Sequence, residues 1–419
     1  MAKQKSPVLE LALAAKQAAR RIAGASTGAK NTALLAYARR LETEGRGVLE
    51  ANARDLEAAR RRGLSAAMQD RLQLDPQRLA AIAQGLREIA ALPDPVGEIT
   101  RMTVRPNGLR VGRMRVPLGV IAIVYEARPN VTCDAAGLCI KSGNAVILRG
   151  GSEAFHSSTA LARLAALSLA EAGLPAEAVT MLPTTDRAAV VELLKLDGVI
   201  DLVIPRGGKE LIRAVVEGST IPVIFHYEGV CHTYVDEGAD VPMAVKVCFN
   251  AKVQRPGVCN AMETLLVHEG VAPAFFRKML PAYRKAGVEI RGCARTKKLA
   301  PWVKAAKPSD YGKEFLELIL AVKVVDSLEE AMAHIARYGS MHTDAIITRD
   351  HGRAMRFVAE VDSSSVIVNA STRFSDGFQY GLGAEMGIST QKLHARGPMG
   401  LEELTCQKFV VLGDGQIRE

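Results

Sequence analysis

Apolar positions in the first 92 residues recur at helical spacing among Ala, Arg and Glu, and this pattern predicts several amphipathic helices. The Arg-Arg-Arg-Gly run at 60–63 is typical of a helix end, where basic side chains complement the helix dipole and glycine stops the helix. We therefore interpret the arginine run as a solvated last turn. A Pro-Asp-Pro sequence at 93–95 ends the helical pattern.

Residues 103–111 alternate between apolar and polar on each side of Asn107-Gly108, and this pattern is a strong signal for a β-hairpin. Polar residues occupy both faces of the hairpin, so it cannot bury itself. Two interpretations stay open. The hairpin is either an arm that pairs with another subunit or a surface hairpin of its own domain.

From Leu118 the pattern changes to short apolar runs separated by helical segments. Apolar strands that alternate with helices predict parallel sheets covered on both faces, which is an α/β fold. The number of strands fits two sheets, with a boundary near residues 225–229 and a return of the chain near Asn369. The predicted strands lie at 119–124, 145–148, 199–204, 222–225, 264–267, 318–325, 345–348 and 365–368.

Composition narrows the class of protein. The formal net charge of +9 suggests an anionic partner, which leaves nucleic acid, a membrane surface or a phosphorylated small molecule. Aromatic residues make up only 5%, which argues against base-stacking surfaces, and no apolar run of about 18 residues predicts a membrane span. The start, residues 1–6, has no apolar core of a secretory signal. Seven scattered cysteines without CxxC spacing fit a reduced, cytoplasmic protein.

One cysteine stands apart from the others. Cys133 and Cys139 lie in an apolar helical pattern and are interpreted as core residues, whereas Cys259 follows a Pro-Gly turn and precedes an apolar strand. A loop thiol near Arg255 and exposed turn amides fits a nucleophile of lowered pKa. A structural role for Cys259 remains the alternative at this point.

Two glycine-rich turns follow predicted strands. They are Arg149-Gly150-Gly151-Ser152 and Arg206-Gly207-Gly208-Lys209. In open α/β sheets such turns hold phosphate groups on backbone amides and helix N-termini, and the arginines would add charge. Neither turn matches a GxGxxG or Walker motif, so tight turns without a ligand are the other interpretation.

A dense polar group at 334–344 includes His334, Tyr338, Ser340, His342 and Asp344, between a predicted helix and a strand. It forms either a satisfied hydrogen-bond network or the lining of a pocket. The chain has no HExxH motif, no paired cysteines and no aspartate cluster, so no catalytic metal is predicted.

Several sequence segments, which follow one another in the order typical of the family, resemble the gamma-glutamyl phosphate reductase family, a branch of the aldehyde dehydrogenase superfamily. The longest is VDSLEEAMAHIARYGSMHTDAI at 325–346, and the resemblance extends from about residue 8 to about residue 411. The supporting segments lie at 124–132, 204–208, 226–232, 370–377, 381–385 and 393–401.

The resemblance implies NADPH-dependent reduction of L-glutamate 5-phosphate to L-glutamate 5-semialdehyde and phosphate, the second step of proline biosynthesis from glutamate. It implies a thioester on Cys259, with Asn130 and the Cys259 amide as oxyanion donors. A homo-oligomer (dimer or tetramer) and channelling of the substrate from glutamate 5-kinase are further expectations. The alternative is an aldehyde dehydrogenase that acylates coenzyme A. A nucleic-acid-binding or scaffolding protein is disfavoured because a recognition helix and a concentrated basic stripe are missing.

The resemblance also assigns parts of the chain. Residues 1–96 and 117–225 would form the NADPH-binding domain, and 97–116 with 404–414 the oligomerisation arm. Residues 226–368 would form the catalytic domain, and 369–403 a return segment to the cofactor domain.

Individual residues receive roles from the same resemblance. His226 stands where aldehyde-oxidising relatives carry a hydrolytic glutamate, which fits a reductase that protects its thioester; a role for His226 or Glu228 in acid–base chemistry stays open. Arg149 would bind the 2′-phosphate of NADPH. The remaining assignments are cofactor contacts at Gly150, Ser152, Arg206, Gly207, Gly208 and Glu317, and substrate contacts at Arg255, Ser371, Thr372 and Arg373.

Overall fold

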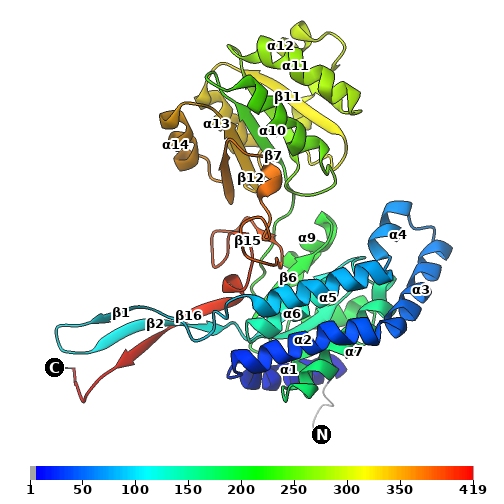
Figure 1. The fold of residues 1–419 in the computed structure, drawn as a ribbon, viewed down its shortest axis with the longest axis vertical. Coiled ribbons are helices and arrows are strands. Elements are labelled where there is room, and N and C mark those ends of the chain that lie inside the picture. Colours follow the sequence, from blue (N-terminus) through cyan, green and yellow to red (C-terminus); the bar gives the residue numbers. More distant parts are fainter. Residues whose placement is uncertain (1–5, 419) are drawn as a thin grey trace. The chain divides into compact units, whose positions relative to one another are not determined.

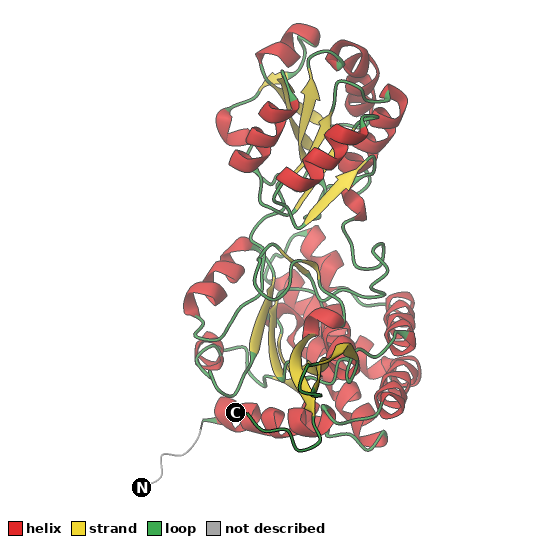
Figure 2. Cartoon of the chain, turned by 90° about the vertical axis from the view of Figure 1, so that its left-hand side faces the viewer, coloured by secondary structure: helices red, strands yellow, loops and turns green. Residues whose placement is uncertain are grey.

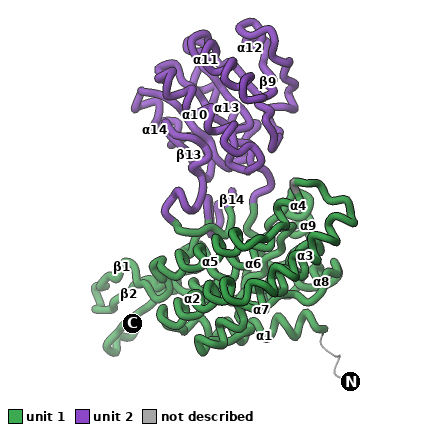
Figure 3. Tube along the Cα trace, turned by 45° about the vertical axis from the view of Figure 1, so that its right-hand side comes forward, with its two compact units in different colours: residues 1–225, 382–387, 399–419 green, residues 226–381, 388–398 purple. Residues whose placement is uncertain are grey.

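The computed structural model describes residues 6–418 and divides into two compact units. Unit 1 comprises Met1–Phe225, Leu382–Gly387 and Met399–Glu419, and unit 2 comprises His226–Gly381 and Ile388–Pro398 (Figure 3). Residues 1–5, on which the expected lack of a secretory signal rests, lie outside the described part of the chain. No helix within residues 6–418 is long and apolar enough to cross a membrane.

The first 92 residues form helices, as the sequence pattern predicts. Local signals set their ends: the Ser6 and Ser26 hydroxyls and the Asp75 carboxylate accept hydrogen bonds from first-turn amides. The arginine run ends a helix as predicted, and Gly63 follows it with φ of +69°, a conformation that glycine adopts without strain. The helices are α1 (Pro7–Ile22), α2 (Thr27–Thr43), α3 (Gly45–Arg61), α4 (Ala66–Leu72) and α5 (Pro76–Ala91).

Unit 1 contains a four-stranded parallel sheet in the order β5-β4-β3-β6. The central strand β3 is completely buried, which is typical of a strand with helices on both faces. The strands are β3 (Val120–Tyr125), β4 (Ala145–Arg149), β5 (Val179–Met181) and β6 (Leu202–Arg206), and the helices that follow them are α6 (Asn130–Lys141), α7 (Phe155–Glu171), α8 (Arg187–Leu193) and α9 (Lys209–Gly218).

The predicted hairpin is confirmed as β1 (Ile99–Val104) and β2 (Arg110–Pro117), which pair in antiparallel fashion. The C-terminal strand β16 (Thr405–Leu412) pairs with the other edge of β2, so three strands extend together from unit 1 (Figure 1). Apolar side chains on these strands are exposed, including Val104, Phe409 and Val411.

Unit 2 contains a seven-stranded parallel sheet in the order β10-β9-β11-β8-β7-β12-β13. Figure 2 shows helices flanking the parallel sheet of each unit. One apolar core includes residues of α10 (Val241–Val253) and α11 (Ala272–Lys285), and a second includes residues of α13 (Leu328–Tyr338) and α14 (His351–Glu360). The fold is therefore α/β with two parallel-sheet units and a β arm, as predicted. The strands of this sheet are β7 (Cys231–Val235), β8 (Met262–His268), β9 (Glu289–Gly292), β10 (Lys304–Ala305), β11 (Ile319–Val325), β12 (Thr343–Ile347) and β13 (Ser365–Val368).

Not every predicted strand forms. Residues 222–225 make only an isolated bridge between Val203 and Val223, because the run is short and Pro222 has no N–H for a ladder. The strands β5, β7, β9 and β10 were not predicted, since their patterns are brief and partly polar. The chain between residues 369 and 403 changes units three times after Gly381, and its short strands β14 (Ile388–Ser389) and β15 (Gly397–Pro398) pair within unit 2.

Candidate active site

Cys259 lies in the turn between α10 and β8 and is partly exposed. Local hydrogen bonds hold this turn: the Ala261 amide donates to the Val258 carbonyl at 3.1 Å, and the Asn260 side-chain amide donates to the Ser375 carbonyl at 2.9 Å. Cys133, Cys139, Cys231 and Cys248 are buried, and burial raises the pKa of each thiol. Cys259 is therefore a thiol that a small molecule can reach.

The loop that leads into β7 packs directly on the backbone of Cys259. A Cβ atom at Gly229 would lie 1.9 Å from the Cys259 carbonyl oxygen, so only glycine fits there. The Cys231 thiol donates to the same carbonyl at 3.1 Å. The Gly229 amide donates to the Glu314 carboxylate at 2.9 Å, and the Val230 amide to the Ser340 hydroxyl at 2.9 Å. The cysteine is thus fixed by its backbone while its side chain stays accessible.

Two histidines converge on Cys259. Ligand atoms of His226, Cys259 and His342 all lie within 4.8 Å of one another, and the two imidazole rings meet edge to face with centroids 5.2 Å apart. His342 is buried, and burial followed by the neighbouring His226 lowers the pKa of its imidazole to about 3. Met341 precedes it with φ of +58°, a strained conformation that is typical of functional sites. Sequence reasoning left the roles of these histidines open, because nothing in their spacing brings 226, 259 and 342 together.

Part of the dense polar group at 334–344 forms a buried hydrogen-bond network around Asp344, but the buried Nε2 atoms of His334 and His342 have no partner among the described residues, so the network is not fully satisfied. Asp344 accepts hydrogen bonds from the His232 amide at 2.8 Å and the His232 ring at 3.0 Å. His334 packs against the rings of Tyr311 and Tyr338. Only His342 in this group also belongs to the cluster with Cys259.

The predicted substrate residues of unit 2 lie in two neighbouring segments. The Arg373 guanidinium donates to the Gln254 side chain at 2.8 Å, next to the exposed Arg255. Burial and the charge of Arg255 lower the pKa of Arg373, whereas Asp376 and Cys259 act in the opposite direction. Ser371 is buried and caps a short 3-10 helix. The buried Thr372 hydroxyl finds no hydrogen-bond partner within residues 6–418.

The two glycine-rich turns of unit 1 lie at the same sheet edge. Strand pairing sets Arg149 beside Val124 and Arg206 beside Tyr125, so the two arginines end the strands on either side of β3. The Arg149 guanidinium donates to the Thr185 carbonyl at 3.2 Å, and its buried Nε has no partner among the described residues. Burial lowers the pKa of Arg149. Gly150 packs against the Tyr125 ring, and a Cβ atom at this position would lie 3.2 Å from the ring carbons. Ser152 is exposed.

Two carboxylates that sequence reasoning missed occupy this edge. Glu126 accepts a hydrogen bond from the Gly208 amide at 2.9 Å, and Glu153 accepts one from the Ala127 amide at 2.6 Å. A Cβ atom at Gly207 would lie 2.5 Å from the Glu126 carboxylate, so this turn is occupied by an internal anion. Glu126 lies in the segment 124–132 and Glu153 directly follows the turn at 149–152, but the direction of their side chains could not be read from the sequence.

Asn130 begins α6, and its side-chain amide donates to Asp134 at 3.1 Å. Burial raises the pKa of Asp134 from 3.8 to about 6, while Asn130 and Arg206 act in the opposite direction. Glu317 is exposed just before β11. Glu314, which sequence reasoning passed over, is the nearby carboxylate that contacts the Gly229 loop beside Cys259.

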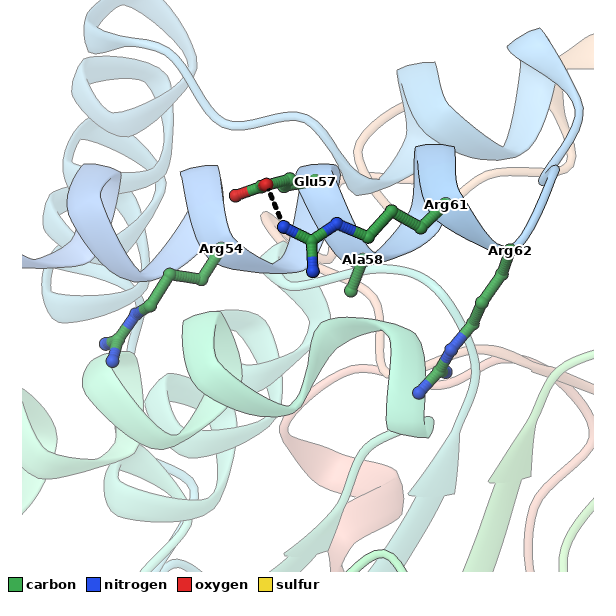
Figure 4. Close-up of a pocket in the computed structure, with 5 residues that line it drawn as sticks. All are labelled: Arg54, Glu57, Ala58, Arg61 and Arg62. Atoms are coloured by element: carbon green, nitrogen blue, oxygen red, sulfur yellow. Dashed lines mark hydrogen bonds and ion pairs between the residues drawn. The ribbon is translucent and has the colours of Figure 1, made fainter.

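A surface pocket lies elsewhere in unit 1, along α3 (Figure 4). Arg61 forms an ion pair with Glu57 in this pocket (Figure 4), and Arg54, Arg61 and Arg62 are exposed. Its position fits the solvated helix end that the arginine run predicts. The lining residues are Arg54, Glu57, Ala58, Arg61 and Arg62.

Comparison with known proteins gives consistent results. Residues 4–313 match the model of the aldehyde dehydrogenase family. The chain is 55% identical over 415 residues to the gamma-glutamyl phosphate reductase of Thermodesulfovibrio yellowstonii, which covers 99% of each chain. A crystal structure of gamma-glutamyl phosphate reductase from Thermotoga maritima superposes with a TM-score of 0.97 at 45% identity, covering 99% of this chain and 100% of that one. An engineered glycolyl-CoA reductase with bound NADP+ shares only the fold, with a TM-score of 0.68 at 14% identity, covering 97% of this chain and 96% of that one.

Proposed function

The chain belongs to the gamma-glutamyl phosphate reductases of the aldehyde dehydrogenase family, and on that premise we propose that it reduces L-glutamate 5-phosphate to L-glutamate 5-semialdehyde and phosphate. The observation that carries this proposal is the partly exposed Cys259 thiol, whose backbone is fixed by the Gly229 loop. The identity of 55% over 99% of both chains favours this reaction over acylation of coenzyme A, for which the likeness is one of fold alone.

Cys259 acts as the nucleophile. Its thiolate attacks the acyl carbon of the acyl phosphate, the carbon–oxygen bond to phosphate breaks, and a thioester forms. NADPH, when bound, supplies the hydride for the reduction. The resulting thiohemiacetal on Cys259 takes up a proton and then collapses, which releases the aldehyde and returns the thiol.

Each tetrahedral intermediate carries an oxyanion that needs hydrogen-bond donors. We assign these to the Cys259 amide and the Asn130 side chain, following the resemblance to the superfamily. The hydrogen bond from Asn130 to Asp134 supports the assignment, because it fixes the side-chain amide at the start of α6.

The thioester must survive until it is reduced. His226 occupies the position of the hydrolytic glutamate of oxidising relatives, and its Nδ1 is held by the Ile388 carbonyl at 2.7 Å. A carboxylate that could activate water is therefore replaced by an imidazole with a fixed orientation.

The carboxyl edge of the unit 1 sheet is the proposed NADPH site. Arg149 would bind the 2′-phosphate, supported by its unsatisfied Nε, with Gly150 and Ser152 beside it. Arg206, Gly207 and Gly208 would contact the pyrophosphate once Glu126 releases the Gly208 amide. Glu317 would hold the nicotinamide ribose; a loss of cofactor affinity in Glu314→Gln but not in Glu317→Gln would transfer this role to Glu314.

Arg255 and Arg373, with Ser371 and Thr372, would recognise the carboxylate and phosphate of the substrate. The two guanidiniums lie on adjacent segments, and the Thr372 hydroxyl is unsatisfied within the described chain. Two cations suit a substrate that carries two anionic groups.

The β arm would join subunits into a dimer or tetramer, because its exposed Val104, Phe409 and Val411 need a covering surface. Seven free cysteines fit the reducing cytoplasm. Delivery of the labile acyl phosphate by glutamate 5-kinase completes the proposed role in proline biosynthesis.

The deciding assay runs the reaction in reverse, with glutamate semialdehyde, NADP+ and phosphate. We expect NADPH formation to require phosphate, because phosphate releases the acyl group from Cys259. Formation of NADPH with coenzyme A in place of phosphate would support the alternative, and phosphate-independent formation of glutamate would contradict both.

A further inference from the structure

The cluster of His226, Cys259 and His342 has the composition of a metal site, two imidazoles and one thiol. Their ligand atoms lie within 4.8 Å of one another. In a tetrahedral zinc site with ordinary bond lengths, ligand atoms are about 3.3–3.6 Å apart, so side-chain adjustments of about 1 Å complete the geometry. Cys259 and His226 are partly exposed, which gives a cation access from solvent.

Each imidazole can present a lone pair to the cluster. A carbonyl oxygen only accepts hydrogen bonds, so the contact of 2.7 Å with Ile388 requires the proton of His226 on Nδ1 and leaves the lone pair on Nε2. Such a contact between a ring N–H and a carbonyl is the usual way in which proteins orient a metal-binding histidine.

His342 supplies an independent observation. Its Nδ1 contacts the Thr343 hydroxyl at 2.9 Å, while its buried Nε2 has no hydrogen-bond partner anywhere in residues 6–418. An unsatisfied buried nitrogen is costly unless something binds it.

The neighbouring Cys231 completes the surroundings without being a ligand itself. Its thiol donates a hydrogen bond to the Cys259 carbonyl at 3.1 Å, so it is already engaged in the structure. The cluster therefore offers three ligands and an open fourth position.

We propose that Cys259, His226 and His342 bind a borderline-soft divalent cation such as Zn²⁺, and that this binding reversibly blocks the enzyme. The thiol releases its proton to solvent as the metal–sulfur bond forms, so the bound sulfur is no longer available as a nucleophile. The inhibitory part of this inference rests on the proposed function of Cys259, whereas the binding part does not.

The first test uses the unsubstituted, fully reduced protein and Co²⁺ as a spectroscopic probe. We expect one equivalent of Co²⁺ to give a sulfur-to-cobalt charge-transfer band with the d–d bands of a four-coordinate site, both lost on addition of Zn²⁺. Zn²⁺ should also protect Cys259 from alkylation by iodoacetamide, read by peptide mass spectrometry, while Cys406 continues to react. Absence of the charge-transfer band, or alkylation of Cys259 at an unchanged rate, would overturn the proposal.

Variants then locate the ligands. Cys259→Ala should remove the charge-transfer band, and His342→Gln should weaken Zn²⁺ binding at least about 100-fold, the upper range for loss of a mere supporting partner. Cys293→Ala and Cys406→Ala are matched controls that should leave the band and the activity unchanged; loss of the band in either would place the metal elsewhere. If His342→Gln does not fold, the alkylation experiment on the unsubstituted protein decides.

The same measurements separate the two proposals. A protein that needs Cys259 for turnover but binds no Zn²⁺ keeps the proposed function and refutes the metal site. If instead the unsubstituted protein binds Zn²⁺ through Cys259 and the Cys259→Ala variant keeps its catalytic activity, the proposed nucleophile is refuted and the metal site is kept.

Discussion

The two parallel sheets present their candidate chemistry at opposite edges. In unit 1, Arg149 and Arg206 stand at the carboxyl ends of strands on either side of β3. In unit 2, Cys259 and His342 precede β8 and β12, so they lie at the amino ends of strands that flank β7. The carboxyl edge is where α/β sheets ordinarily bind ligands. The amino edge of unit 2 departs from that rule.

The two edges also differ in charge. The unit 1 edge carries arginines and carboxylates, and Glu126 and Glu153 already accept hydrogen bonds from turn amides. The unit 2 cluster consists of a thiol and two imidazoles, and burial keeps His342 neutral. A charged edge suits binding of an anionic dinucleotide, whereas a weakly charged cluster suits a nucleophile whose reactivity must be controlled.

The largest expected effect concerns the unit 2 thiol. Cys259→Ala should lower kcat at least about 10⁴-fold, because removal of a nucleophile removes the covalent path. Cys293→Ser is the matched control. Burial raises the pKa of the Cys293 thiol, but hydrogen bonds with Thr296 and the Val324 amide outweigh burial and lower this pKa. We assign Cys293 no catalytic role. Steady-state kinetics with both variants would contradict our assignment if Cys293→Ser were the more damaging change.

The next effect concerns the close approach that fixes Cys259. Gly229→Ala places a Cβ atom 1.9 Å from the Cys259 carbonyl oxygen and should cost about 3 kcal/mol through displaced backbone, with a large loss of activity. Gly238→Ala, in the same unit, has no atom within 4 Å of the new Cβ and should be nearly neutral. Thermal unfolding and kcat measure both. Equal behaviour of the two variants would show that the loop does not constrain the cysteine.

A smaller effect is expected at the unit 1 edge. Arg149→Ala should raise the KM for NADPH about 10–100-fold and change the KM for NADH little, because the lost hydrogen bonds go to the 2′-phosphate. Arg206→Ala should weaken both cofactors alike. A similar loss of NADPH and NADH binding in Arg149→Ala would move the 2′-phosphate site elsewhere.

The smallest effect is a pH dependence of stability. Asp134 has its pKa raised from 3.8 to about 6, mainly by burial, so the stability of the fold falls as the pH rises from about 4 to about 6. Asp134→Asn should therefore raise the free energy of unfolding by about 1–2 kcal/mol at pH 7.5 and should give little gain at pH 4. Denaturant unfolding at both pH values measures this. The Met243 amide lowers the pKa of Asp240, so Asp240→Asn should lower the free energy of unfolding at pH 7.5.

The amino-acid sequence determined the features that local physics encodes. Apolar periodicity predicted the helices before residue 92 and most strands of both sheets, and Asn107-Gly108 predicted the hairpin. Turn chemistry singled out Cys259 from the core cysteines. The prediction of a strand at 222–225 was wrong, because an apolar run does not show whether a neighbouring strand can pair with it along its full length.

Only the tertiary structure decided which distant residues meet. Strand order and register brought residues 226, 259 and 342 together, set Gly229 against Cys259, and turned Glu126 and Glu153 onto the turn amides of unit 1. Local patterns specify the period of each element and the shape of each turn. The pairing of strands, by contrast, depends on how the whole chain packs its apolar faces, and that packing fixed the chemistry at each edge.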